Sequence, residues 1–158
     1  MKKLIAFVLT LAMATIMSVT AFAAEITPGS DPKTGDTTVV YSVAPTYTVT
    51  IPSEVSLDSS FEINAENVVL EQGKQLEVAL TATSGAGNAF TVSNGSTGLL
   101  TYDVKVGETP ISVGDTVLTV NPTTAPTGSA TLNFSAPTST IVYAGNYSGT
   151  VTFTVSVK

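Results

Sequence analysis

The final stretch of this sequence alternates strictly between apolar and hydroxyl side chains. Residues 147–157 read Tyr-Ser-Gly-Thr-Val-Thr-Phe-Thr-Val-Ser-Val, so that Thr or Ser separates each of Val151, Phe153, Val155 and Val157 from the next. In an extended chain successive side chains point to opposite faces, which places these four apolar residues on one face and the hydroxyls on the other. The pattern therefore predicts a half-buried β-strand and excludes a helix here.

The same period of two recurs through the chain from residue 37 onward. Gly, Pro, Asn and Asp separate the apolar segments at intervals typical of turns between short strands. No helical period is present in this part of the sequence. We therefore predict an all-β fold, a two-sheet Ig-like or Greek-key β-sandwich. Its predicted strands are Thr37–Val43, Thr46–Ile51, Phe61–Ile63, Val68–Leu70, Gln75–Leu80, Ala89–Ser93, Leu99–Val106, Ile111–Val113, Thr116–Val120, Ala130–Phe134, Thr140–Tyr143 and Tyr147–Val157.

The first residues have the pattern of an export signal. Met-Lys-Lys is followed by an apolar run and then by Ala21-Phe22-Ala23, whose small residues suit a signal peptidase, so we predict cleavage after Ala23. The expected organisation is a signal peptide at 1–23, a flexible polar leader at 24–36 and one β-sandwich domain at 37–158. The expected location is secreted or at the cell surface, with no membrane span once the signal is removed.

Charge and missing residue types restrict the function. Cleavage would remove two lysines and change the formal net charge from −6 to −8, which disfavours nucleic acid and anionic lipid as partners. The sequence has no Cys, His, Trp or Arg. Without Cys and His, neither a Ser-His-Asp triad, a Cys-His pair nor a thiolate or imidazole metal site can form. Stability must come from apolar burial and strand pairing rather than from disulfides.

The remaining chemistry available is that of carboxylates. The acidic residues are scattered over predicted turns and outer strand faces, where side chains are normally solvated, so we predict that the protein is not an enzyme and has no cofactor. Asp31 with Asp36, or Glu108 with Asp115, could supply oxygen ligands to Ca²⁺. No Asp-x-Asp-x-Asp-Gly loop is present, and turns use acidic residues for backbone reasons, so no metal site is predicted.

The closing segment also resembles a known kind of protein. Residues 143–157 fit Ala-Gly-x-Tyr-x-Gly-x-Val-x-Phe-x-Val, which is similar to the closing strand of small bacterial secreted surface domains, including spore coat protein U-like and fimbrial-type adhesin subunits. The resemblance implies a non-catalytic structural or adhesive protein, with itself or other surface proteins as partners. It makes Tyr147, Gly149, Val151, Phe153 and Val155 a structural motif, in which Tyr147 acts like a tyrosine corner.

Such fibres can assemble by strand donation, in which an extension of one subunit completes the sheet of the next. The candidate partner segment here is Thr37–Val43, with Thr37, Val39, Tyr41 and Val43 on one face. The chain departs from chaperone–usher subunits in having no disulfide. Pairing of this segment within its own domain, as a first strand, is the alternative.

A carbohydrate-binding module of the extracellular surface is the second functional alternative. Sugars stack on exposed aromatic rings, and without Trp this platform would have to come from tyrosines. Most of them fall at core-facing or strand-end positions of the predicted strands. The five tyrosines are Tyr41, Tyr47, Tyr102, Tyr143 and Tyr147.

Overall fold

The computed structural model describes residues 7–10, 25–31, 33–95 and 98–158, and of residues 7–10 only the backbone. In these ranges the chain forms strands and a single short 3₁₀ turn, η1 (Ala86–Asn88). None of the helices described is long and apolar enough to cross a membrane. The strands are β1 (Phe7–Thr10), β2 (Thr46–Ile51), β3 (Ser59–Val69), β4 (Leu76–Thr83), β5 (Thr91–Ser93), β6 (Leu99–Thr101), β7 (Val104–Val106), β8 (Thr109–Pro110), β9 (Thr116–Val120), β10 (Gly128–Phe134) and β11 (Val151–Val157).

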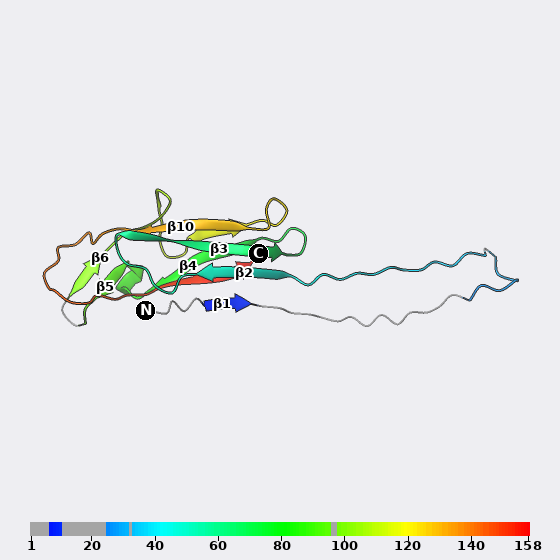
Figure 1. Ribbon diagram of the computed structural model, residues 1–158, viewed down its shortest axis with the longest axis horizontal. Helices are drawn as coiled ribbons and strands as arrows, with labels where there is room; N and C mark the ends of the chain where they lie inside the picture. The colour runs from blue at the N-terminus through cyan, green and yellow to red at the C-terminus, as the bar shows by residue number, and fades with distance from the viewer. Residues whose placement is uncertain (1–6, 11–24, 32, 96–97) are drawn as a thin grey trace, which may run out of the picture.

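Two antiparallel sheets form the body of the molecule, so the predicted all-β sandwich is confirmed. One sheet has the order β1-β2-β3-β10-β7-β8 and the other the order β11-β4-β9. A small hairpin of β5 and β6 stands at one end of the body, and residues 25–31 and 33–45 extend away from the opposite end (Figure 1). Because β10 lies between β3 and β7, the chain crosses between sheets instead of forming a simple meander.

The core lies between the two sheets and is built from the inward residues of alternating strands. Ile63 and Leu132 of the first sheet and Leu76, Val78 and Leu80 of the second are all at most 1% exposed. Aromatic rings continue this core toward β11: Phe61 stacks on Phe134 at 5.4 Å and meets Phe153 edge-on at 6.1 Å. Burial of these side chains supplies the stabilisation that a chain without disulfides requires.

Several strands differ in extent from the prediction. The segments Phe61–Ile63 and Val68–Leu70 belong to one long strand, β3, which contains an irregularity in its pairing with β2 near Asn67, a residue with φ of 54°. Asn tolerates this left-handed conformation, and the resulting bulge lets the strand continue where the alternation is interrupted. The predicted strand Leu99–Val106 is divided at Tyr102 and Asp103, because β6 pairs with β5 whereas β7 pairs with β10.

Three predicted strands are wrong. Thr37–Val43 forms no strand and is exposed throughout, because none of the described strands pairs with it. Thr140–Tyr143 is an irregular part of the connection between β10 and β11. Ile111–Val113 also forms no strand and comes directly after the two-residue strand β8. The closing strand forms but begins at Val151 instead of Tyr147.

The predicted domain boundaries fall partly on residues that the structure describes. The predicted signal peptide, 1–23, lies outside the described residues except for β1. The described residues of the predicted leader, 24–36, contain no strand and are exposed, apart from the half-buried Ser30. The sandwich itself takes up the sequence from Thr46 onward.

Candidate functional site

The segment that leads into the sandwich exposes an unusual amount of apolar surface. Val39 and Tyr41 are each 91% exposed, and Val40 and Val43 are also largely exposed. The backbone here is extended and runs away from the body (Figure 1). In an extended chain Val39, Tyr41 and Val43 share one face, so the segment presents a row of apolar side chains to solvent.

The first strand of the sandwich proper lies close to a sheet edge. On one side β2 pairs with β3, and on the other it pairs antiparallel with β1, with Phe7 opposite Ile51 and Thr10 opposite Thr48. β1 falls inside the predicted signal peptide. If that signal is removed, the β2 backbone groups on this side lose their partner, and such an edge accepts another strand.

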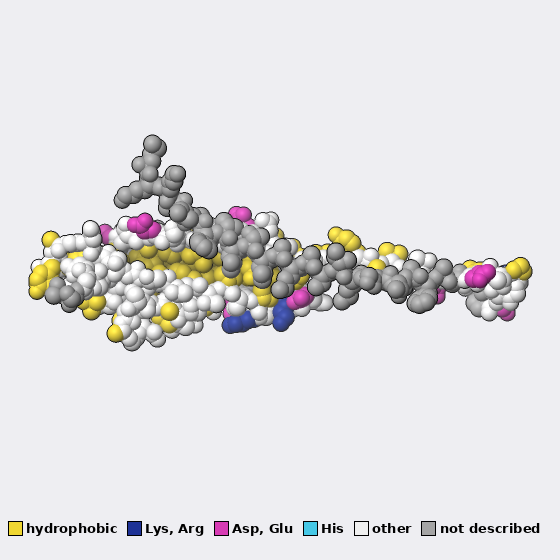
Figure 2. All heavy atoms as spheres, turned by 90° about the horizontal axis from the view of Figure 1, so that it is seen from below, with side chains coloured by type: hydrophobic (Ala, Val, Ile, Leu, Met, Phe, Trp, Pro, Cys, Tyr) yellow, Lys and Arg dark blue, Asp and Glu magenta, His cyan; other side chains and the backbone are white. Residues whose placement is uncertain are grey.

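The same side of the sandwich is open between its two sheets. A hollow of about 220 Å³ lies here, and the half-buried side chains of Ile51, Val55, Phe61, Val151 and Phe153 form its apolar walls. Figure 2 shows hydrophobic side chains in a long band on this face of the body. An apolar hollow beside a sheet edge offers both backbone hydrogen bonds and side-chain burial to an added strand.

The predicted closing motif holds the start of β11 against the rest of the domain. The Tyr147 hydroxyl donates to the carbonyl oxygen of Tyr143 at 2.8 Å, as expected for a tyrosine-corner arrangement, and its ring is half-buried. Ser148 exchanges two backbone hydrogen bonds with Ser93 of β5. At Gly149 a Cβ would collide with the carbonyl oxygen of Thr91, so this glycine is needed for close approach of the two chains.

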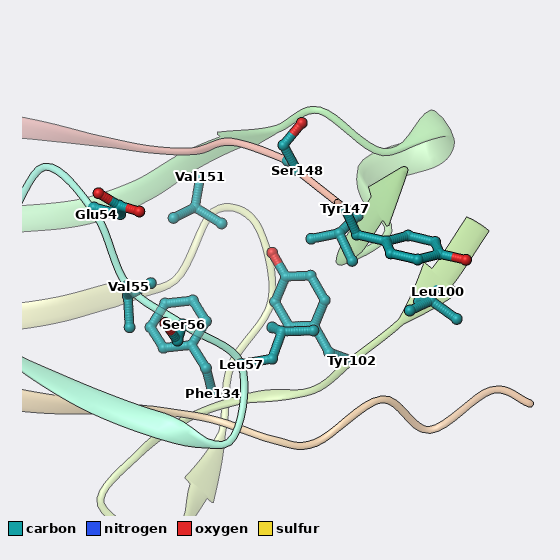
Figure 3. A pocket seen from close by; sticks show the side chains of 12 residues that line it. Glu54, Val55, Ser56, Leu57, Leu100, Tyr102, Phe134, Tyr147, Ser148 and Val151 are labelled. Atoms are coloured by element: carbon teal, nitrogen blue, oxygen red, sulfur yellow. The ribbon is translucent and has the colours of Figure 1, made fainter. Parts of the chain in front are cut away.

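A second, larger cavity of about 420 Å³ lies at the end of the sandwich nearest β5 and β6 (Figure 3). Its wall is mixed: polar side chains, among them Ser56 and Ser148, lie beside five aliphatic ones. The aliphatic side chains are those of Val55, Leu57, Val92, Leu100 and Val151. The ring of Tyr102 stands in the middle of the view with its hydroxyl directed into the space, whereas the Tyr147 hydroxyl points away (Figure 3). Burial raises the pKa of the Tyr102 phenol, which keeps it protonated.

The carboxylates considered for metal binding or catalysis are not gathered in the described parts of the chain. No group of three or more acidic side chains is close enough to hold a metal ion there. Asp115 has a local role, because its Oδ2 accepts a hydrogen bond from the backbone N–H of Ser112 at 2.8 Å. Asp31, Asp36 and Glu108 are exposed.

The tyrosines do not assemble into a shared platform. Tyr102 is buried and Tyr47 and Tyr147 are half-buried, while Tyr41 and Tyr143 are exposed. Tyr41 lies on the extended segment before β2, whereas Tyr143 belongs to the connection between β10 and β11. In Figure 1 these two segments lie at opposite ends of the molecule. The two exposed rings therefore do not form one stacking surface in a single copy.

Sequence reasoning placed Tyr102 correctly on the inward face but missed the cavity around its hydroxyl. A tyrosine among inward-facing valines does indicate that a polar group or a space lies near its hydroxyl, because a buried hydroxyl needs a hydrogen-bond partner. The shape of the space depends on the loop at 52–58 and on residues 147–151, which approach one another only in the folded chain.

Comparison with known proteins gives no match: no family model fits the sequence, and no curated protein or solved structure is significantly similar to it. The function must therefore be argued from the residues and geometry described above.

Proposed function

We propose that this chain is a non-catalytic secreted or cell-surface protein with a structural or adhesive role, the subunit of a surface fibre. In this proposal the segment 37–43 of one copy pairs with the β2 edge of the next copy. Its apolar face, Val39, Tyr41 and Val43, packs into the hollow between β2 and β11. The segment and the hollow lie in the same chain, so each copy both donates and accepts.

The observation that carries the proposal is the exposure of this apolar segment. Val39 and Tyr41 contact almost nothing in the single chain, since each is 91% exposed. Full burial of an aliphatic or aromatic side chain is worth roughly 1.5–3 kcal/mol, so packing against the half-buried side chains of the hollow would stabilise the segment. Pairing with an edge strand would also satisfy its backbone N–H and C=O groups.

The position of the segment argues against a partner within the same chain. Only Ala44 and Pro45 separate it from β2, and in the structure it continues outward from that strand instead of folding back (Figure 1). A second copy has no such restriction, because its segment can approach the β2 edge from outside.

The state of assembly of the exported protein tests the proposal. We expect size-exclusion chromatography with light scattering to show species larger than a monomer, and electron microscopy to show filaments. The double variant Val39→Asp with Tyr41→Asp places two charges on the apolar face and should give monomers. Its matched control is Thr38→Asp with Ser42→Asp, which adds the same charge on the opposite face and should still assemble.

Circular dichroism and thermal unfolding of both double variants establish whether the sandwich is intact. An exported protein that stays monomeric at all concentrations would refute the fibre proposal. Equal assembly by both double variants would show that the apolar face of the segment is not the contact.

The alternative, a carbohydrate-binding module, has one observation in its favour. Residues 78–102 and 116–157 contain no charged residue, and β5 and β6 belong to the first of these stretches. A hollow of about 540 Å³ there is lined by hydroxyl side chains together with small apolar ones; the hydroxyls are those of Ser84, Thr91, Ser93, Thr101, Ser148 and Thr150. Such a surface suits a neutral polysaccharide, and depletion of one from solution by the purified protein would support this function.

A further inference from the structure

The cavity at the end of the sandwich contains a hydroxyl that has no partner among the described residues. Tyr102 is 6% exposed, and its hydroxyl makes no hydrogen bond to another described residue. The hydroxyl oxygen itself is not fully enclosed by protein, so water can reach it and a bound molecule would replace that water. Figure 3 shows this hydroxyl directed into the cavity, where a bound molecule could reach it.

The rest of the cavity is suited to an apolar ring. Tyr102 and Phe134 lie side by side with ring centroids 6.0 Å apart and planes inclined at 34°. Aliphatic side chains, together with Ser56 and Ser148, line the remaining space. The volume of about 420 Å³ is within the range of small-molecule sites. At about 30 Å³ for each water-sized group, it accommodates roughly fourteen non-hydrogen atoms at most.

We propose that this cavity is a binding site for a small, uncharged aromatic molecule with one hydrogen-bonding group, of the size of indole or a substituted phenol. The ring of the ligand packs against Tyr102, Phe134 and Val151, and its polar group pairs with the Tyr102 hydroxyl. The cavity adjoins the hollow of the proposed strand contact and shares Val55 and Val151 with it.

The lining favours this class over charged ligands and sugars. No Lys lines the cavity and Glu54 lies at its margin, so an anion would find repulsion and no counter-charge. A cation would have to lose its hydration against apolar walls, and the carboxylate of Glu54 is itself exposed to water. A monosaccharide carries hydroxyls on most of its carbons, and the aliphatic side chains and Phe134 that form part of the lining offer them no hydrogen-bond partner.

Indole is a convenient probe because the chain contains no Trp, so indole fluorescence reports only the ligand. We expect saturable binding to the exported protein, with changes in the methyl NMR signals of Val92, Leu100 and Val151. The variant Tyr102→Phe keeps the ring but removes the hydroxyl, and should weaken binding about two- to tenfold. The control variant Tyr47→Phe removes a hydroxyl outside the cavity and should leave the affinity unchanged.

A second variant, Val55→Phe, adds bulk to the wall and should abolish binding without any change to Tyr102. The proposal is overturned if indole does not saturate, if the three methyl signals stay unchanged, or if Tyr102→Phe binds as tightly as the parent protein. Larger shifts of the same methyl signals with maltohexaose than with indole would instead identify a sugar site. The methyl measurement uses the parent protein, so it decides the question even if a variant fails to fold. Because a monomeric protein can still bind indole, failure of the fibre proposal leaves this test unaffected.

Discussion

Strands β4 and β11 are neighbours in one sheet and share the same alternating pattern, yet they are covered to very different degrees. Val78 of β4 is completely buried, whereas Val155 of β11, directly opposite it in the register, is only half-buried. The next inward pair shows the same contrast, with Leu80 buried and Phe153 half-buried.

The difference arises from position in the sheet. β4 lies between β11 and β9 and faces the middle of the opposite sheet, while β11 is an edge strand beside the open hollow at Ile51 and Phe61. Alternation therefore predicts which face of a strand is apolar, but the opposing sheet decides how completely that face is covered. The half-covered strand is the one that a further strand could complete.

The largest expected difference between the two strands is in the free energy of unfolding that is lost when Val78 of β4 or its partner Val155 of β11 is shortened to alanine. Val78→Ala should lower the free energy of unfolding by about 2–3 kcal/mol, because it removes buried methyl groups and leaves a cavity. Val155→Ala removes the same atoms from a half-exposed position and should cost less than about 1 kcal/mol in the monomer. Urea unfolding of both variants measures the difference.

This pair of variants can contradict the comparison directly. Equal losses of stability would mean that β11 is as well covered as β4 in solution. If Val155→Ala costs more stability in the assembled protein than in the monomer, while the cost of Val78→Ala stays the same, a second copy covers β11.

A smaller effect is expected where the chain enters β11. Tyr147→Phe removes the hydroxyl that donates to the Tyr143 carbonyl oxygen at 2.8 Å and keeps the ring. One such hydrogen bond is worth about 0.5–1.5 kcal/mol, so the thermal midpoint should fall modestly. Hydrogen exchange should increase at Ser148 and Thr150, whose N–H groups hold this entry segment, while exchange in β4 stays slow. Equal acceleration in β4 would show that the hydroxyl stabilises the whole domain.

Local alternation was sufficient to predict much of the sandwich. The prediction was close for β9 and β10 and for the body of β11, because their apolar residues follow the period of two and Gly or Pro punctuates the connections. The closing tyrosine was also predictable, since its hydroxyl bonds to a residue only four positions away.

What the sequence did not reveal depends on contacts between distant segments. Thr37–Val43 has the composition of a strand, but a strand needs a neighbour, and no strand in the described part of the chain pairs with it. The division between β6 and β7 follows from a change of sheet at Tyr102 and Asp103, which the unbroken alternation of this segment conceals. The cavity around the Tyr102 hydroxyl likewise exists only where the 52–58 loop meets residues 147–151.

The smallest expected effect on stability concerns the start of β4 and the end of β11, which are joined by an ion pair at Glu77. Lys158 Nζ lies 2.6 Å from Glu77 Oε2, and Gln75 Nε2 donates to Glu77 Oε1 at 2.8 Å. The hydrogen bond from Lys158, followed by that from Gln75, lowers the pKa of the Glu77 carboxyl below its ordinary value. The stabilisation is therefore fully present above the pKa of an unfolded glutamate, about 4.3, and is lost as the pH falls through the lower pKa of the folded state.

Two measurements follow from this arrangement of Glu77 and Lys158. NMR titration should give Glu77 a pKa below that of an unfolded glutamate, and Lys158→Met should move it back toward the ordinary value. The difference in stability between the parent protein and Glu77→Gln should be small near neutral pH, reduced by added salt because the Lys158 side chain is 65% exposed, and absent at strongly acidic pH. A stability difference that persists below the folded-state pKa of Glu77 would mean that packing, rather than charge, joins the ends of β4 and β11.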